Sequence, residues 1–208
     1  MKFERPKIYP ITDSRISRIS HREQCEKLIA GGATIIQLRE KHASSRDFYE
    51  AANSAIELAR SCGVRIIIND RVDVALALKA DGVHLGQKDI PPEKAREILG
   101  PTAIIGFSTH SVEQAVAAIR LPVDYIAIGP IFETLTKNAA DEAVGLDGLT
   151  RVRTAVGDFP LAAIGGITLE NIRDVLAAGA GSAAVISAII SDPLAIESRM
   201  IEFNDRIK

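Results

Sequence analysis

Aromatic residues and cysteines are scarce in this chain of 208 residues. Tryptophan is absent, and aromatic residues make up only 4% of the sequence. Aliphatic side chains must therefore fill the interior, and recognition of nucleic acid by base stacking is not expected. The two cysteines, Cys25 and Cys62, have no CxxC spacing and no nearby histidine pair. The sequence thus predicts two buried thiols rather than a zinc site or a disulfide framework.

The chain also lacks a dominant charge and a long apolar run. Its 25 basic residues nearly balance its 27 acidic residues, for a formal net charge of -2, so no strong field attracts a polyanion or an anionic membrane. No apolar run approaches the roughly 18 residues of a membrane-spanning helix, and residues 1–10 do not resemble a signal peptide. We therefore expect a cytoplasmic protein that binds small molecules, without nucleic-acid or membrane partners. Whether it forms a homo-oligomer is left open.

Eight short aliphatic runs alternate with amphipathic stretches of helical spacing. Continuously apolar strands separated by helices are typical of a parallel sheet covered by helices. Eight units in one chain of this length favour a closed (β/α)8 TIM barrel over an open doubly wound sheet, and no GxGxxG sequence follows the first run. We predict a single barrel domain, residues 1–208. The expected strands are Ile8 to Ile11, Ile35 to Leu38, Ile66 to Ile68, Gly82 to Leu85, Ile104 to Gly106, Tyr125 to Ile128, Leu161 to Ile164 and Ala183 to Ile186. The expected helices include Ser45 to Cys62, Ser111 to Ile119 and Thr168 to Ala178.

Polar residues that follow the strands converge on one mouth of such a barrel. Gly165 and Gly166 follow the seventh strand, and Ile186 and Ser187 lie at the end of the eighth. Backbone N–H groups in these two loops commonly hold phosphate, and glycine lets the chain approach the anion closely. An ordinary turn is the alternative for the two glycines. Their position in the barrel favours a phosphate site.

The end of the second strand carries Gln37, Arg39 and Lys41, which alternation along extended backbone directs to one side. Two cations and an amide suit a diphosphate. A solvated charged loop is the alternative for an isolated pair of cations. Because the segment sits at the functional end of a strand, the diphosphate interpretation is favoured.

Two acidic residues, Asp70 and Asp89, end neighbouring strand units. Carboxylates on adjacent strand ends can share a hard cation that keeps water or phosphate oxygens as its other ligands. The sequence therefore predicts a Mg2+ site. Salt bridges to the adjacent Arg71 and Lys88 are the alternative, although neighbours on extended backbone point apart.

A long loop from Gly129 to Gly145 follows the sixth strand and contains Thr134, Thr136 and Lys137. Two hydroxyls and a cation suit phosphate, and a loop of this length can close over a reactive intermediate. The alternative is an ordinary surface loop. His84 is expected to be a core residue or to support the site from behind, and His21 and His42 are expected at the surface.

Taken in order, these motifs resemble the thiamine phosphate synthase family from Ile8 to Ser187. The resemblance covers the segments QLREK (37–41), INDRVD (68–73), DGVHLGQKD (81–89), STH (108–110), GPIF (129–132) with Thr134, Thr136 and Lys137, and IGGI (164–167). Two positions depart from the family pattern: Lys88, where an acidic residue is frequent, and Glu133, where a small residue or proline is common. Glu133 adds negative charge beside the phosphate-binding loop.

The resemblance implies a transferase that joins 4-amino-5-hydroxymethyl-2-methylpyrimidine diphosphate to a thiazole phosphate, or to its carboxylated form, giving thiamine phosphate and pyrophosphate. Carried over residue by residue, it implies a metal pair, a diphosphate site with catalytic cations, and a thiazole phosphate site. Mg2+ would bind to Asp70 and Asp89. The pyrimidine diphosphate would bind to Gln37, Arg39, Lys41, Asn69, Ser108 and Lys137, of which Arg39, Lys41, Ser108 and Lys137 would be catalytic. The thiazole phosphate would bind to Thr134, Thr136, Gly166, Ile186 and Ser187.

Two other functions compete with this interpretation. A thiazole tautomerase-like isomerase would use the same barrel but would not need a diphosphate or metal site. A non-catalytic barrel that binds thiamine intermediates would not need a pair of metal carboxylates. The presence of Asp70, Asp89, Arg39 and Lys41 argues against both.

Overall fold

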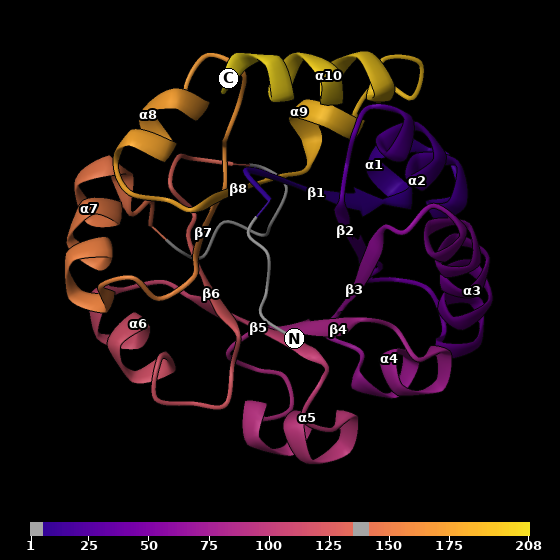
Figure 1. Cartoon of the computed structure of the whole chain (residues 1–208), viewed down its shortest axis with the longest axis horizontal. Coiled ribbons are helices and arrows are strands. Elements are labelled where there is room, and N and C mark those ends of the chain that lie inside the picture. The colour runs from indigo at the N-terminus through magenta and orange to yellow at the C-terminus, as the bar shows by residue number, and fades with distance from the viewer. Residues whose placement is uncertain (1–5, 135–141) are drawn as a thin grey trace.

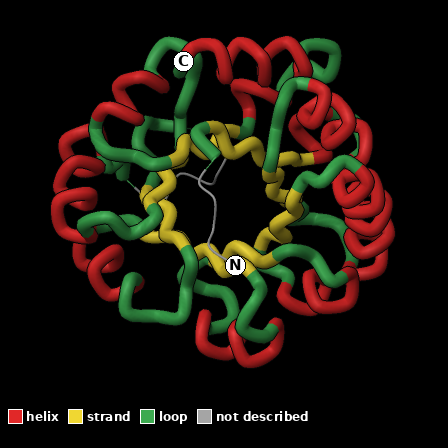
Figure 2. The backbone as a smooth tube through the Cα atoms, in the orientation of Figure 1, coloured by secondary structure: helices red, strands yellow, loops and turns green. Residues whose placement is uncertain are grey.

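The computed structural model describes residues 6–134 and 142–208. Eight parallel strands close into a barrel in chain order, and helices surround it (Figures 1 and 2). The TIM-barrel prediction is therefore confirmed. The strands are β1 (Ile8–Asp13), β2 (Ile35–Arg39), β3 (Arg65–Asn69), β4 (Gly82–Leu85), β5 (Ile104–Thr109), β6 (Tyr125–Ile128), β7 (Leu161–Ile164) and β8 (Ser182–Val185).

The helices of the described residues lie outside the barrel and connect each strand to the next, as Figure 1 shows. Two follow the first strand and two follow the last, and one follows each of the others. They are α1 (Ser14–Ser17), α2 (His21–Ala30), α3 (Ser45–Ser61), α4 (Val72–Leu78), α5 (Pro92–Leu99), α6 (Val112–Ala118), α7 (Gly145–Val156), α8 (Ile172–Ala177), α9 (Ser187–Ile190) and α10 (Ile196–Arg206).

The strands are apolar along their length because both of their faces are buried. Ile66, Ile67 and Ile68 of β3 alternate between the barrel interior and the helical layer, and none is more than 1% exposed. Polar side chains begin to replace aliphatic ones toward the strand ends, as at Asn69 of β3. The fold therefore separates a stabilising aliphatic layer from a polar mouth.

Several element boundaries differ from the sequence prediction. In two of them, hydrogen bonds of polar residues decide where the element ends or begins. Strand β5 does not end at Gly106 but continues to Thr109, whose hydroxyl donates to the carbonyl of Ala127 on β6 at 2.9 Å. Helix α8 begins at Ile172 rather than Thr168, because Thr168 N–H instead donates to the side-chain oxygen of Asn171 at 2.8 Å.

Two predictions of exposure were wrong. His21 is 2% exposed, because α2 packs its first turn against the barrel and its ring lies beside Phe48. Cys62 is exposed, because α3 ends one residue earlier and Cys62 is its C-cap. Cys25 is buried as predicted, and burial raises the pKa of its thiol to about 12.

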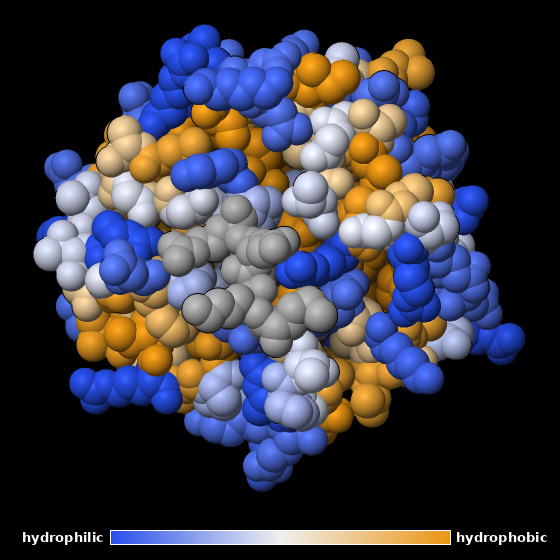
Figure 3. All heavy atoms as spheres, in the orientation of Figure 1, coloured by the Kyte–Doolittle hydropathy of each residue, from blue (hydrophilic) through white to orange (hydrophobic). Residues whose placement is uncertain are grey.

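Hydrophilic residues cover much of the helical perimeter in the face shown in Figure 3, with apolar residues between the helices. Within the described ranges, no helix combines the length and hydropathy needed to cross a membrane.

Candidate functional site

Asp70 and Asp89 lie together at the C-terminal ends of β3 and β4. Asp70 has left-handed backbone (φ 63°), and its N–H donates to the carbonyl of His84 at 2.8 Å. Asp89 accepts from the N–H of Gly86 at 2.6 Å and shares a hydrogen bond with the Asp70 carboxyl. Burial raises the pKa of Asp89; the Gly86 hydrogen bond opposes this rise, and the Asp70 charge adds to it.

The alternative that these carboxylates serve salt bridges to their sequence neighbours is not what the structure shows. Arg71 pairs with Asp73, and its guanidinium also donates to the Ser45 hydroxyl at 2.8 Å. Lys41 instead forms an ion pair with Asp70. Two adjacent carboxylates have the oxygen donors that a hard cation prefers. No cluster of three or more His, Cys, Asp or Glu side chains that could hold a metal occurs within residues 6–134 and 142–208.

The two cations predicted to bind a diphosphate have different partners. Lys41 is beside the carboxylate pair, whereas Arg39 forms an ion pair with Asp13 at the end of β1. Asp13 also caps α1 by accepting from Arg15 and Ile16 N–H at 3.0 and 3.2 Å. It therefore holds Arg39 at the barrel mouth, a role that sequence reasoning did not assign to it. Asp13 and Arg39 are partners in the register of β1 and β2. The signal for this role is therefore an acidic residue at the end of the strand that pairs with β2.

Three uncharged polar residues of the predicted diphosphate site are buried near the strand ends. They are Gln37, Asn69 and Ser108, on β2, β3 and β5. The Gln37 amide donates to the Tyr9 hydroxyl at 3.1 Å, and the Ser108 hydroxyl is 2.9 Å from His84 Nε2. The Asn69 Nδ2 is fully buried and has no hydrogen-bond partner within the described part of the chain. A buried donor without a partner is costly, and a bound ligand can satisfy it.

The loop after β7 is built so that glycine is required. Gly165 and Gly166 have φ values of 103° and 65°. A Cβ at Gly166 would lie 2.7 Å from Cβ of Phe132 and 2.9 Å from the carbonyl oxygen of Glu133. Phe132 N–H donates to the Gly165 carbonyl at 3.1 Å. The segment that leads to Thr134 therefore packs directly on the glycine loop.

The end of β8 provides the other half of the predicted phosphate site. Ile186 is the N-cap of α9 and makes no side-chain cap hydrogen bond, and Ser187 is the exposed first residue of that helix. Thr134, Gly166, Ile186 and Ser187 thus follow strands β6, β7 and β8, which are neighbours in the barrel. Thr136 and Lys137 of the predicted site lie outside the described residues.

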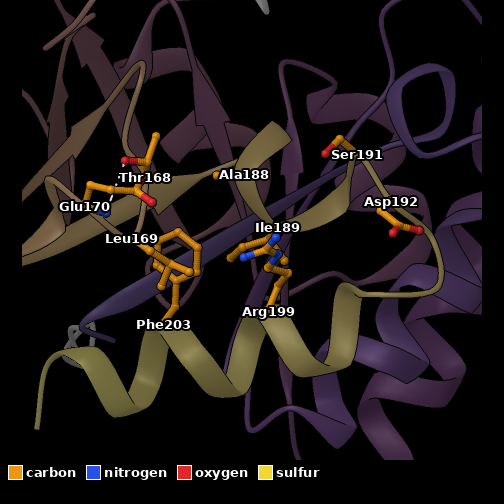
Figure 4. Close-up of a pocket in the computed structure, with 9 residues that line it drawn as sticks. All are labelled: Thr168, Leu169, Glu170, Ala188, Ile189, Ser191, Asp192, Arg199 and Phe203. Carbon is orange, nitrogen blue, oxygen red and sulfur yellow. Dashed lines mark hydrogen bonds between the residues drawn. The ribbon is translucent and has the colours of Figure 1, made fainter.

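A pocket of ≈ 290 Å³ lies next to this loop pair but on its outer side. Figure 4 shows that its lining comes from the loop after β7, from α9 and from α10, where Arg199 and Phe203 face the pocket. The pocket shares no residue with the predicted substrate site. It begins two residues beyond Gly166, at Thr168, and includes Ala188 next to Ser187.

A second polar cluster supports the end of β2. Glu40 accepts from the Ser14 hydroxyl at 2.6 Å and lies 3.7 Å from Nε2 of the buried His21. Burial lowers the pKa of His21, although the charges of Glu40 and Asp13 oppose this. The Thr12 hydroxyl is 2.7 Å from His21 Nδ1. This cluster fixes the backbone that leads from Arg39 to Lys41.

Sequence reasoning missed Tyr9 and Tyr125, which lie inside the barrel and contact predicted site residues. Both were counted as parts of apolar strands. Their hydroxyls are 3.0 Å apart, and that of Tyr125 is 2.9 Å from His84 Nδ1. His84 is buried, as predicted. The signal in the sequence was a tyrosine in an otherwise aliphatic strand. A buried tyrosine hydroxyl needs a hydrogen-bond partner, so it indicates a polar contact inside the barrel.

Comparison with known proteins supports the family resemblance of the sequence motifs over most of the chain. Residues 8–189 match the model of the thiamine monophosphate synthase family. The chain is 48% identical over 186 residues to thiamine-phosphate synthase from Chloroflexus aurantiacus, covering 89% of this chain and 85% of the relative. It is 46% identical over 187 residues to the enzyme of the same name from Clostridium novyi, covering 89% and 91%.

A solved structure agrees with these relatives. The thiamine phosphate pyrophosphorylase from Pyrococcus furiosus superposes with a TM-score of 0.87 at 39% identity, over 97% of this chain and 95% of that one. The family match, the identities and the shared barrel together show that the chain belongs to the thiamine monophosphate synthase family, whose members are transferases of thiamine biosynthesis.

Proposed function

We propose that this chain joins 4-amino-5-hydroxymethyl-2-methylpyrimidine diphosphate to 4-methyl-5-(2-phosphooxyethyl)thiazole, or to its carboxylated form, releasing pyrophosphate. The observation that carries the proposal is the adjacent carboxylate pair of Asp70 and Asp89, with Lys41 in an ion pair with Asp70. A thiazole isomerase or a passive carrier has no use for such a pair.

Mg2+ fits this pair. Asp70 and Asp89 would supply two carboxylate oxygens and leave the other positions of the ion for water and diphosphate oxygens. The bound ion would neutralise charge that develops on the departing diphosphate. Because burial and the charge of Asp70 raise the pKa of Asp89, a bound cation would favour the charged form of this carboxylate.

Cationic side chains of the protein would bind the diphosphate and stabilise it as the leaving group. Lys41 would move from Asp70 to the diphosphate, and Arg39 would reach it from the strand end where Asp13 holds it. Lys137 completes the proposed cationic set from the loop after β6. As the C–O bond breaks, the aminopyrimidine releases electrons to the exocyclic methylene, and the thiazole nitrogen captures that carbon. This dissociative route needs stabilisation of the leaving group and no strong base.

The second substrate would bind on the opposite side of the mouth. Gly166, Ile186 and Ser187 would present backbone N–H groups and a hydroxyl to the thiazole phosphate, and Thr134 and Thr136 would add two further hydroxyls. Two phosphate sites on different strands would hold the nitrogen near the methylene carbon.

The direct test mixes the purified chain with both substrates and Mg2+, and follows pyrophosphate and thiamine phosphate with and without a chelator. We expect both products in equal amounts, and loss of both when the metal is removed. Folded protein that forms no product would contradict the proposal. Thiazole isomerisation and binding of the separate compounds would then distinguish the isomerase from the carrier.

Asn69 allows a separate prediction, because its buried amide nitrogen has no partner among the described residues. Asn69→Leu removes this donor and keeps a branched side chain with the same number of heavy atoms. We expect the free energy of unfolding to stay the same or rise by about 1 kcal/mol, measured by urea denaturation. The KM for the pyrimidine diphosphate should rise at least about tenfold, because a substrate contact is lost.

The control for this variant is Asn53→Leu on α3, where the side-chain amide donates to the Glu57 carboxylate at 3.0 Å on the helix surface. It should leave both KM values unchanged. A clear loss of stability in Asn69→Leu with unchanged kinetics would assign Asn69 a structural role.

A further inference from the structure

A continuous line of side-chain hydrogen bonds crosses the barrel and joins two predicted substrate residues. It runs from the Gln37 amide to Tyr9 (3.1 Å), from Tyr9 to Tyr125 (3.0 Å), from Tyr125 to His84 Nδ1 (2.9 Å), and from His84 Nε2 to Ser108 (2.9 Å). All five residues are buried. We call Tyr9, Tyr125 and His84 the barrel chain.

The barrel chain exists because of two features of the strands. Tyr9 on β1 and Tyr125 on β6 lie on strands that are not neighbours, so their contact passes through the barrel interior. His84 and Tyr125 are both in register with Gly106, on the strand between them. A Cβ at Gly106 would lie 2.1 Å from the Tyr125 ring and 2.5 Å from His84 Nδ1. Glycine at this position therefore leaves the room that lets the two side chains meet.

One donor in this line is fixed. The Gln37 nitrogen donates to the Tyr9 oxygen at 3.1 Å. Burial raises the pKa of Tyr9 to about 12 and that of Tyr125 well above its usual value, so both phenols keep their protons. The hydrogen bonds from Tyr9 through Tyr125 and His84 to Ser108 connect this acceptor to the end of β5.

The line sets what the Gln37 end offers at the barrel mouth. With its nitrogen held by Tyr9, the Gln37 amide can offer its oxygen as an acceptor. At the other end, the Ser108 hydroxyl is held 2.9 Å from His84 Nε2. An aminopyrimidine carries the complement of an acceptor, which is an amino group that donates.

We propose that Tyr9, Tyr125 and His84 are positioning residues that select the aminopyrimidine ring by fixing the Gln37 amide as an acceptor and holding the Ser108 hydroxyl in place. The inference rests on the proposed function for the identity of the ring. It adds a means of recognition in which residues buried beneath the site decide how two groups that would contact the substrate are presented. A ring with the opposite pattern, with a carbonyl in place of the amino group, would be rejected.

The test removes one oxygen. In Tyr125→Phe we expect kcat/KM for the pyrimidine diphosphate to fall about tenfold through a higher KM, while the KM for the thiazole phosphate stays unchanged. Tyr9→Phe, which removes the acceptor of Gln37 but leaves the His84–Ser108 bond, is a second variant with the same expected pattern. Tyr49→Phe removes the hydroxyl of a tyrosine that is 41% exposed on α3, and it should match the wild type.

A double-mutant cycle separates positioning from a general loss of packing. If Tyr125 acts through Ser108, adding Tyr125→Phe to Ser108→Ala should cost clearly less than the tenfold seen in the wild-type background. Equal costs in both backgrounds would overturn the proposal. So would wild-type kinetics in Tyr125→Phe and Tyr9→Phe.

Binding of the pyrimidine diphosphate, measured by calorimetry on the same proteins, distinguishes this proposal from the proposed function. A wild-type chain that binds the pyrimidine but forms no product would contradict the synthase reaction. Weaker binding by Tyr125→Phe would still support the barrel chain in that case. A wild-type chain that does not bind the pyrimidine would overturn both.

Discussion

Replacing Asp89 by alanine should cut turnover about a hundredfold or more at a fixed, low Mg2+ concentration, with the fold retained. The variant removes one of the two carboxylates of the proposed metal site. The other carboxylate, Asp70, stays in its ion pair with Lys41. The ion would then bind more weakly and stabilise the leaving diphosphate less well. Part of the activity should return as the Mg2+ concentration is raised, and steady-state rates across a Mg2+ titration measure both effects.

Asp158→Ala is the matched control for this variant. Asp158 is exposed and lies between α7 and β7, at the opposite end of the barrel, so its removal should change neither turnover nor the metal titration. Asp70→Asn complements it, because asparagine tolerates the left-handed backbone of residue 70 and removes only the charge. Unchanged metal dependence in Asp89→Ala would exclude Asp89 as a ligand.

The barrel could be predicted because its strands are the simplest part of the sequence. Strands β4, β6 and β7 have the bounds that their apolar runs predict. Prediction failed where polar residues belong to regular structure. Ser108 and Thr109 seemed to follow β5, yet they are its last residues. A polarity pattern cannot distinguish a strand end that faces a polar site from the loop after it.

The site was partly predictable because barrel topology brings consecutive strand ends together. The prediction that Asp70 and Asp89 lie together required only the order of the strands, and the two carboxyl groups are in contact. The ion pair of Arg39 with Asp13 is also between neighbouring strands, but it required the register of β1 and β2. Register is a three-dimensional quantity that short apolar runs leave undetermined.

Contacts across the barrel were beyond sequence reasoning altogether. Tyr9 and Tyr125 are 116 residues apart and lie on strands that do not pair. Their meeting depends on which side chains point inward and on the space that Gly106 leaves. For the same reason His21, whose neighbours in sequence are polar, seemed to be a surface residue although it is 2% exposed.

The phosphate site should respond most strongly to a charge at Ser187. Ser187 is the exposed first residue of α9, beside the N-cap Ile186 that makes no side-chain cap hydrogen bond. Ser187→Asp would place a carboxylate where the thiazole phosphate is proposed to bind. Two like charges about 4 Å apart repel by about 4 kcal/mol near a protein surface. Because Ser187 is exposed, solvent and salt screen part of this repulsion. We therefore expect the KM for the thiazole phosphate to rise about a hundredfold, while the KM for the pyrimidine diphosphate changes little.

Ser187→Asn separates the charge from the size of the new side chain, because asparagine has nearly the same shape and no charge. It should raise the KM for the thiazole phosphate much less than Ser187→Asp does. The charged variant should also improve at high ionic strength, since an exposed carboxylate is screened by salt, whereas a steric defect is not. Equal effects of Ser187→Asp on both substrates would move Ser187 out of the thiazole phosphate site. Equal effects of both variants would mean that the loop after β8 excludes bulk rather than charge.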